Sequence, residues 1–309
     1  MTDRAEAATP QAPKRADLYA GSLSPADKVI IAYILVMTLL VCLSRERIPD
    51  WLAYVVRHAL MVLAVVAVAK WFSVFAGRAG RFVRAWYPVP LIPSTYFELS
   101  YLIPRLHPRD FDWELARIDY RIFGAHPTVW LERALWPPLT EVLQVAYASY
   151  YFYPIILGAV LWGKGWSERF HFFVFILALG FYLSYLGYVI VPAIGPRFIL
   201  ADQQTEPLAG LLLFPYIRQA LDNASGVTRD CFPSGHTALT LLVLYYAHRF
   251  HRRTFWSILA PASALIFSTV YLRYHYVIDI LAGVALAALV VVVAAPLYKL
   301  LNENRAAGL

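Results

Sequence analysis

Seven apolar stretches divide this chain, and each has roughly the 20 residues that an α-helix needs to cross a membrane. They lie at about 28–44, 52–74, 139–162, 170–192, 233–250, 254–273 and 276–298. An eighth stretch, 86–104, is interrupted by Pro88, Pro90, Pro93 and Glu98, and we count it as a further membrane helix. Because a backbone in lipid must satisfy its own hydrogen bonds, such segments become helices. The sequence therefore predicts an all-α, polytopic membrane bundle of about 7–8 transmembrane helices.

Composition and charge narrow the class of protein further. The chain of 309 residues is 60% hydrophobic and 15% charged, and a soluble domain of this size carries more charge. The net charge is +7, but the arginines lie in short loops between apolar stretches. This pattern favours contact with anionic membrane lipids and argues against a nucleic-acid partner. The two cysteines, Cys42 and Cys231, resemble neither a disulfide framework nor a metal site.

The chain is expected to have four parts. They are a flexible cytoplasmic tail at 1–27, N-terminal membrane helices at 28–104, an interfacial amphipathic segment at 105–138, and a membrane core at 139–300. Ser24-Pro25-Ala26-Asp27 reads as a capping box with proline in the first helical turn, which is the signal for the start of the first helix.

The basic loops indicate how the chain crosses the membrane. The loop at 248–253 carries three arginines and no acidic residue, so the positive-inside rule places it in the cytoplasm. The candidate site described next lies at the other ends of the flanking helices. We therefore expect an integral protein of the inner or plasma membrane, with both termini inside and the site on the extracytoplasmic face.

Two histidine motifs stand where apolar stretches begin. Pro233-Ser234-Gly235-His236 opens one stretch, and His275-Tyr276-Val277-Ile278-Asp279 opens another. Two apolar stretches lie between the histidines, so the chain crosses the membrane and returns. His236 and His275 should therefore meet at the same face of the bilayer.

His275 and Asp279 are four residues apart and share one face of a helix. Asp279 can then accept a ring N–H of His275, which makes the other ring nitrogen a better nucleophile toward phosphorus. The alternative is an interfacial histidine followed by a carboxylate that the helix dipole favours. A carboxylate at membrane depth is nevertheless a functional candidate by default.

Ser234 and Gly235 begin a helix, where free amides and the dipole bind anions. Glycine also lets the backbone approach a phosphate closely. Simple helix capping explains the same residues equally well. It does not explain His236, which follows on the face shared with His275 and can protonate a leaving oxygen.

Phosphate also requires fixed cations, and the planar fork of arginine suits it. Arg197 is the preferred candidate because it follows Gly195-Pro196 in a rigid turn, and Arg229 and Arg273 are further candidates. For each of them the alternative is an ordinary arginine that anchors the chain at the interface.

The C-terminal two-thirds of the chain resembles the type 2 phosphatidic acid phosphatase (PAP2) superfamily, and within it the inositol phosphorylceramide synthase-like branch. Pro233 to His236 matches the second family motif, and Ser268, His275 and Asp279 match the third. The third motif departs at Thr269, where the family has arginine.

The first family motif is absent as such. Ile190 stands where its lysine would be, and Arg197 supplies only the arginine, so Arg273 is a candidate to replace the missing cation. Upstream segments are similar to the same branch: Trp86-Tyr87-Pro88, Tyr96-Phe97-Glu98, Ile118-Asp119 with Phe123-Gly124, and Tyr147 to Pro154.

The resemblance implies that 139–300 is a PAP2-type catalytic core acting on a lipid phosphate without metal or cofactor. It also implies that His275 attacks phosphorus to form phosphohistidine, Asp279 orients it, and His236 protonates the leaving group. Water or an alcohol such as inositol would then accept the phosphoryl group. The competing interpretation is a transporter or channel with a buried polar pathway. A vanadate-dependent haloperoxidase on the same scaffold is disfavoured because those enzymes are soluble.

Overall fold

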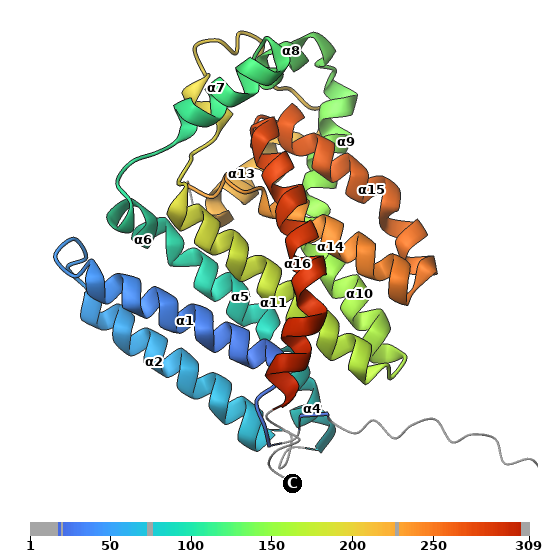
Figure 1. Cartoon of the computed structure of the whole chain (residues 1–309). Coiled ribbons are helices and arrows are strands. Elements are labelled where there is room, and N and C mark those ends of the chain that lie inside the picture. Colours follow the sequence, from blue (N-terminus) through green and yellow to red (C-terminus); the bar gives the residue numbers. More distant parts are fainter. Residues whose placement is uncertain (1–17, 20, 73–76, 226–228, 304–309) are drawn as a thin grey trace, which may run out of the picture.

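The computed structural model describes residues 18–19, 21–72, 77–225 and 229–303, and within these ranges it contains helices and no strand (Figure 1). Six helical segments of the described residues are long and apolar enough to cross a membrane. They are α1 (Pro25–Leu43), α2 with η1 (Trp51–Phe72), α9 to α10 (Pro137–Gly163), α11 (Ser167–Ile190), α15 (Arg252–Tyr271) and α16, whose span is Val277–Asn302. The all-α polytopic membrane fold is therefore confirmed.

The stretch predicted at 233–250 forms α14 (Gly235–Phe250), which has only 16 residues. That is shorter than the roughly 20 residues of a complete crossing. The helix packs against α11, α15 and α16, and most of its side chains are buried. A helix enclosed by other helices meets little lipid, so its length need not match the bilayer.

The stretch predicted at 86–104 forms two short helices instead of one. α4 (Gly77–Trp86) is followed by α5 (Pro88–Phe97) and α6 (Leu99–Leu106), and the break falls at Glu98. The Glu98 carboxylate is buried, 3.2 Å from His58 Nε2 and 3.8 Å from Arg57 Nε, both on α2. A carboxylate in this apolar region turns toward protein partners because an unpaired charge in lipid is costly.

The capping box at the start of α1 is confirmed. Asp27 N donates to Ser24 Oγ at 3.3 Å, and Ser24 N donates to Asp27 Oδ2 at 2.7 Å. Asp27 also accepts from Arg84 Nη1 of α4 at 3.1 Å, which ties α1 to α4. The helix thus begins within the segment expected to be a tail, and residues 1–17 and 20 of that tail lie outside the described residues.

α11 runs through the middle of the bundle and contacts α1, α5, α6, α10, α14 and α16 (Figure 1). It is apolar on all sides and largely buried, as a helix surrounded by others should be. Gly187 on α11 lets Pro233 pack directly against this helix, because a side chain at position 187 would collide with Pro233. α11 therefore fixes the turn from which α14 starts.

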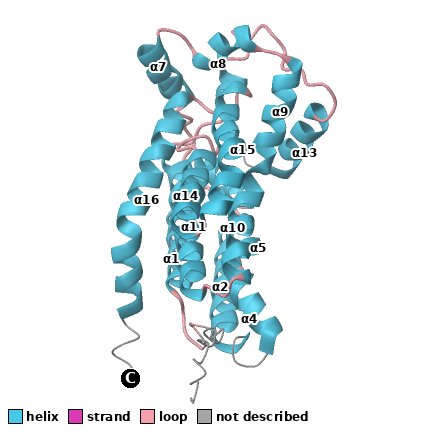
Figure 2. Cartoon of the chain, turned by 90° about the vertical axis from the view of Figure 1, so that its right-hand side faces the viewer, coloured by secondary structure: helices cyan, strands magenta, loops and turns pink. Residues whose placement is uncertain are grey.

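One end of the bundle carries short helices that lie across the ends of the long ones. α7 (Asp112–Phe123), α8 (Pro127–Trp130), η2 (Leu131–Ala134) and α13 (Phe214–Ser225) form this cap. Figure 2 shows α7, α8 and α13 at the end opposite to α4 and the C-terminus. Trp113 and Trp130 on the cap and Trp136 at the start of α9 are more than half exposed, a placement that tryptophan favours at a membrane interface.

Candidate active site

The structure brings His236 and His275 together at the base of the cap. His236 lies in the first turn of α14, and His275 lies in the loop that joins α15 to α16 (Val277–Glu303). His275 Nε2 is 3.5 Å from His236 Nδ1, and the ring centroids are 5.6 Å apart. The antiparallel return of α14 and α15 is what places residues 39 apart in sequence side by side.

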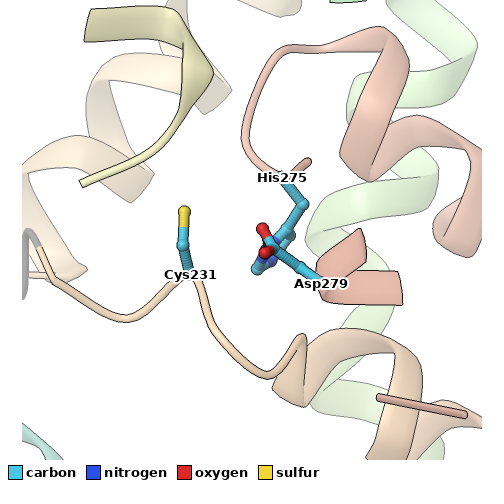
Figure 3. A group of neighbouring side chains, drawn as sticks. All are labelled: Cys231, His275 and Asp279. Atoms are coloured by element: carbon cyan, nitrogen blue, oxygen red, sulfur yellow. Dashed lines mark hydrogen bonds and ion pairs between the residues drawn. The ribbon is translucent and has the colours of Figure 1, made fainter. Parts of the chain in front are cut away.

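Asp279 holds His275 from the other side. Its Oδ2 is 3.3 Å from His275 Nδ1 and accepts from Tyr276 N at 2.9 Å, and the His275 and Asp279 side chains are both buried (Figure 3). A carboxylate on Nδ1 favours the tautomer with the proton on that nitrogen. The lone pair of His275 is then on Nε2, which faces His236.

A second carboxylate, Asp119 on α7, caps the helix that carries Asp279. Asp119 Oδ2 accepts from Val277 N at 2.7 Å, and Oδ1 accepts from Ile278 N at 2.8 Å. These amides belong to the first turn of α16 and have no partner within the helix. Burial raises the pKa of the Asp119 carboxyl, and the two amides oppose that rise. Asp119 was noticed in the sequence only as part of a family resemblance.

Asp112 lies on the same face of α7 as Asp119 and binds the loop that follows α11. It accepts from Ile194 N at 2.9 Å and Gly195 N at 2.8 Å, and the Tyr276 hydroxyl donates to it at 3.0 Å. Burial raises the pKa of Asp112, and these donors oppose the rise. Sequence reasoning missed Asp112. The available signal was its spacing of seven residues from Asp119, which puts both acids on one helical face.

Aromatic rings enclose His236. Tyr147 stacks on the imidazole with 4.7 Å between centroids, and Tyr150 lies at 4.5 Å. Tyr147 also stacks on Tyr274, the residue directly before His275, with 4.3 Å between the ring centroids. The rings leave His236 half-buried and limit the orientations that its imidazole can take.

Ser234 and Gly235 serve the fold directly. Ser234 Oγ accepts from Thr237 N at 3.2 Å as the N-cap of α14, and Ser234 N donates to Asp279 O at 3.0 Å. A side chain at Gly235 would collide with the Tyr188 hydroxyl. Both residues therefore join α14 to its neighbours, and their contact with phosphate stays a prediction.

Arg197 and Arg229 are both paired with an aspartate, and Arg197 also approaches the ring of Tyr274 beside the site. The Arg197 guanidinium lies 5.2 Å from the centroid of the Tyr274 ring, and its Nη1 donates to Asp222 at 2.7 Å on the exposed side. Arg229 makes a two-pronged contact with Asp110, at 2.6 and 3.0 Å. The preference for Arg197 over Arg229 as a phosphate ligand stays a prediction.

Arg273 is buried and bound to the cap. Its Nη2 donates to Glu132 Oε1 at 2.9 Å and to Glu206 O at 2.6 Å, and its backbone is left-handed, with φ of 67°. These contacts are those of an anchor between the loop after α15 and η2. Its role as the replacement cation stays a prediction.

Arg218 on α13 is a cation that sequence reasoning missed. Its guanidinium lies 5.7 Å from the centroid of the Tyr274 ring, and among the described residues it has no ion-pair partner. Arg197 and Arg218 thus approach the same ring beside His275. The sequence predicts a loop for this segment, and no residue pattern in it points to Arg218.

Cys231 lies next to the pair formed by His275 and Asp279, and the donor atoms of the three lie within 4.8 Å of one another (Figure 3). Such a group can in principle hold a metal ion. However, Cys231 Sγ donates to Tyr274 O at 3.1 Å, and burial raises the pKa of the thiol. A cysteine binds metal as the thiolate, and this environment does not favour a thiolate at Cys231. The expectation of a metal-free site stays a prediction.

Comparison with known proteins assigns the family. The profile of the PAP2 superfamily matches residues 113–293, which is more than half of the chain and includes Asp119, His236, His275 and Asp279. A PA-phosphatase related-family protein of Dictyostelium discoideum is 27% identical over 164 residues, which cover 47% of this chain and 30% of that protein. The chain therefore matches less than a third of this curated relative. No solved structure matches the chain. The profile match shows that the chain belongs to the PAP2 superfamily.

Proposed function

We propose that the protein is a lipid phosphatase or phosphotransferase that works through a phosphohistidine at His275. The observation that carries this proposal is the line of three side chains, in which Asp279 contacts Nδ1 of His275 and His236 faces Nε2. The family supports phosphatase-type chemistry on lipids in general. A nucleophile with an orienting group on one side and an acid on the other is the arrangement that covalent catalysis requires.

The first half-reaction balances on these residues alone. His275 Nε2 attacks phosphorus, the N–P bond forms, and the bond from phosphorus to the lipid or head-group oxygen breaks. His236 gives its proton to that oxygen. The contact of 3.5 Å between the two imidazoles must open to admit the phosphoryl group. Asp279 stabilises the positive charge that forms on His275.

The second half-reaction reverses the roles. A water or alcohol oxygen attacks phosphorus, His236 takes the proton, and the N–P bond breaks to free His275. Arg197 and Arg218 would hold the phosphoryl oxygens, because both approach the Tyr274 ring beside the nucleophile. Positioned guanidinium groups stabilise the charge that spreads over those oxygens in the transition state.

The resemblance to the inositol phosphorylceramide synthase-like branch supports an alcohol acceptor such as inositol, whereas the name of the Dictyostelium relative refers to phosphatidic acid phosphatase. Incubating the purified protein with labelled lipid phosphates and phospholipids, with and without inositol or glycerol, separates these activities. Inorganic phosphate as the product identifies a phosphatase, and a phosphorylated alcohol identifies a transferase. If neither product forms from any lipid, the proposal is wrong.

We also expect activity to persist in EDTA, because arginines and a helix start take the place of a divalent cation. Vanadate, which imitates five-coordinate phosphorus, should inhibit. Measuring turnover and bound metal in the same EDTA-treated sample tests this directly. Loss of turnover that a divalent ion restores would show that the Cys231 group, or another site, holds a catalytic metal.

A further inference from the structure

An apolar, aromatic cavity of about 460 Å³ begins at His236 and extends between α5, α10 (Phe152–Gly163) and α11. At one end its lining includes Asp230 and His236, and the Tyr96 hydroxyl donates to Asp230 at 2.6 Å. Among the described residues that line it, Asp230 and His236 are the ones that are acidic or basic. The cavity is thus polar where the proposed chemistry takes place and apolar elsewhere.

The cavity is long and ends at aromatic rings. Its wall on α11 extends from Tyr188 to Phe170, which are 18 residues apart, or roughly 27 Å along the helix. One leaflet of hydrocarbon is about 15 Å thick, half of a bilayer core. At the far end the Trp86 ring lies 5.4 Å from Phe170, and a Cβ at Gly158 would be 3.3 Å from Trp86. Trp86 and Gly158 therefore close the end that is remote from His236.

The side of the cavity opens where a membrane would surround the bundle. α5 and α10 both pack on α11 and lie on either side of it (Figure 1). The lining residues Val89 and Phe97 of α5 and Ile155 of α10 are 45%, 49% and 42% exposed. A hydrocarbon chain can enter between these helices from the bilayer without passing through water.

We propose that this cavity holds one hydrocarbon chain of the lipid substrate, and that Trp86 and Gly158 set the longest chain that fits. The inference rests on the proposed function, because it names the substrate of the same site. The cavity joins His236, so a head group at the histidines and a chain in the cavity belong to one molecule. Each methylene withdrawn from contact with the cavity lowers the binding constant by roughly four-fold.

The test uses the full-length protein purified in detergent and a series of phosphatidic acids with octanoyl, dodecanoyl, hexadecanoyl or eicosanoyl chains. Ile155→Trp narrows the cavity, and Ile156→Trp is its control on the same helix, with 40% exposure but outside the lining. We expect Ile155→Trp to lower kcat/KM for the hexadecanoyl lipid by about ten-fold and to leave the octanoyl lipid within about two-fold. Ile156→Trp should leave the whole chain-length profile unchanged.

A second pair of variants tests the closed end. Trp86→Ala deepens the cavity and should move the preferred chain toward eicosanoyl. The control is Trp162→Ala. The Trp162 ring also packs on Phe170, with 5.2 Å between centroids, but it lies outside the lining, so its loss should not change the preferred chain length. Equal losses for all chain lengths in both members of a pair would overturn the proposal.

Native mass spectrometry with non-hydrolysable alkyl phosphonates of the same chain lengths gives a readout that does not need turnover. If no lipid phosphate is turned over but the phosphonates bind with the expected chain-length dependence, the proposed function fails and the chain site stands. Binding that Ile155→Trp and Trp86→Ala leave unchanged at every length would remove the chain site.

Discussion

At the scale of single residues, the two histidines should act as one unit. We expect His275→Ala and His236→Ala each to abolish turnover while the protein still inserts and purifies. The double variant should lose little more than either single one, because the first substitution already removes the shared reaction. Measuring kcat/KM for all three variants tests this. A rate close to that of the unchanged protein in either single variant would remove the catalytic assignment.

The arginines should differ in their effects. Arg197→Ala and Arg218→Ala should each lower kcat/KM by roughly ten- to a hundred-fold, the equivalent of about 1.5–3 kcal/mol for a charge-assisted contact. Lysine should restore little, because it lacks the planar fork. Arg229→Ala is the matched control, since its guanidinium binds Asp110 through two nitrogens, whereas that of Arg197 binds Asp222 through Nη1 and lies against the Tyr274 ring. Equal losses in all three variants would show that the arginines support the fold and not the phosphate.

A different measurement distinguishes the role of Arg273 from the roles of Arg197 and Arg218. Its contacts with Glu132 and Glu206 predict that Arg273→Ala lowers the melting temperature. If it binds phosphate as well, KM for lipid phosphate rises in a variant that is still folded. Restoring the family pattern with Thr269→Arg is not a clean rescue, because Thr269 is fully buried and its carbonyl accepts from the His275 amide.

The sequence allowed His236 and His275 to be placed together because two apolar stretches lie between them, and their number can be read from hydropathy alone. Arg218 and Asp112 could not be placed in this way. Arg218 reaches the site only through the position of α13, and Asp112 binds residues 82 and 83 positions later in the chain. Such contacts follow from tertiary packing, which a residue pattern in one segment does not contain.

At the scale of elements, α7 should keep His275 and Asp279 aligned through its contact with the start of α16. Asp119 satisfies two amides at the start of α16, the helix that carries Asp279. We expect Asp119→Ala to lower kcat more than it raises KM, because His275 and Asp279 would lose their alignment while the phosphate ligands stay in place. Asp119→Asn keeps one oxygen acceptor and should recover part of kcat.

The exposed acid Glu114 of the same helix provides the control for this prediction, since its side chain pairs with Arg109 on the surface. Glu114→Ala should leave both kinetic constants unchanged. If Asp119→Ala affects only the melting temperature and leaves kcat intact, α7 contributes to stability alone.

The breaks between elements show where sequence periodicity reaches its limit. The 86–104 stretch is apolar enough for one helix, but Glu98 turns inward to His58 and divides it into α5 and α6. The partner of Glu98 lies 40 residues earlier, on α2. The 86–104 stretch is not among the six helical segments long and apolar enough to cross a membrane, so its crossing stays a prediction, and its break coincides with the long-range contact of Glu98.

At the scale of the whole molecule, the orientation in the membrane is indicated by basic residues at the end of the bundle opposite to the cap. Arg169 Nη1 reaches Phe250 O at 3.4 Å, and Lys28 Nζ donates to Leu301 O at 2.5 Å, so several basic residues gather at the end opposite to the cap. The positive-inside rule predicts that this end is cytoplasmic. The histidine pair would then face the extracytoplasmic side.

Labelling of introduced cysteines decides this orientation. Cys42 and Cys231 are first replaced, and single cysteines are introduced at Arg252 and at Gln203, which are both exposed and lie at opposite ends of the bundle. We expect a membrane-impermeant thiol reagent to label position 203 on intact cells, and position 252 only after the membrane is opened. Labelling of both after lysis shows that each thiol is reactive. Labelling of 252 and not of 203 on intact cells would place the histidines in the cytoplasm, where the lipid substrate would have to come from the inner leaflet.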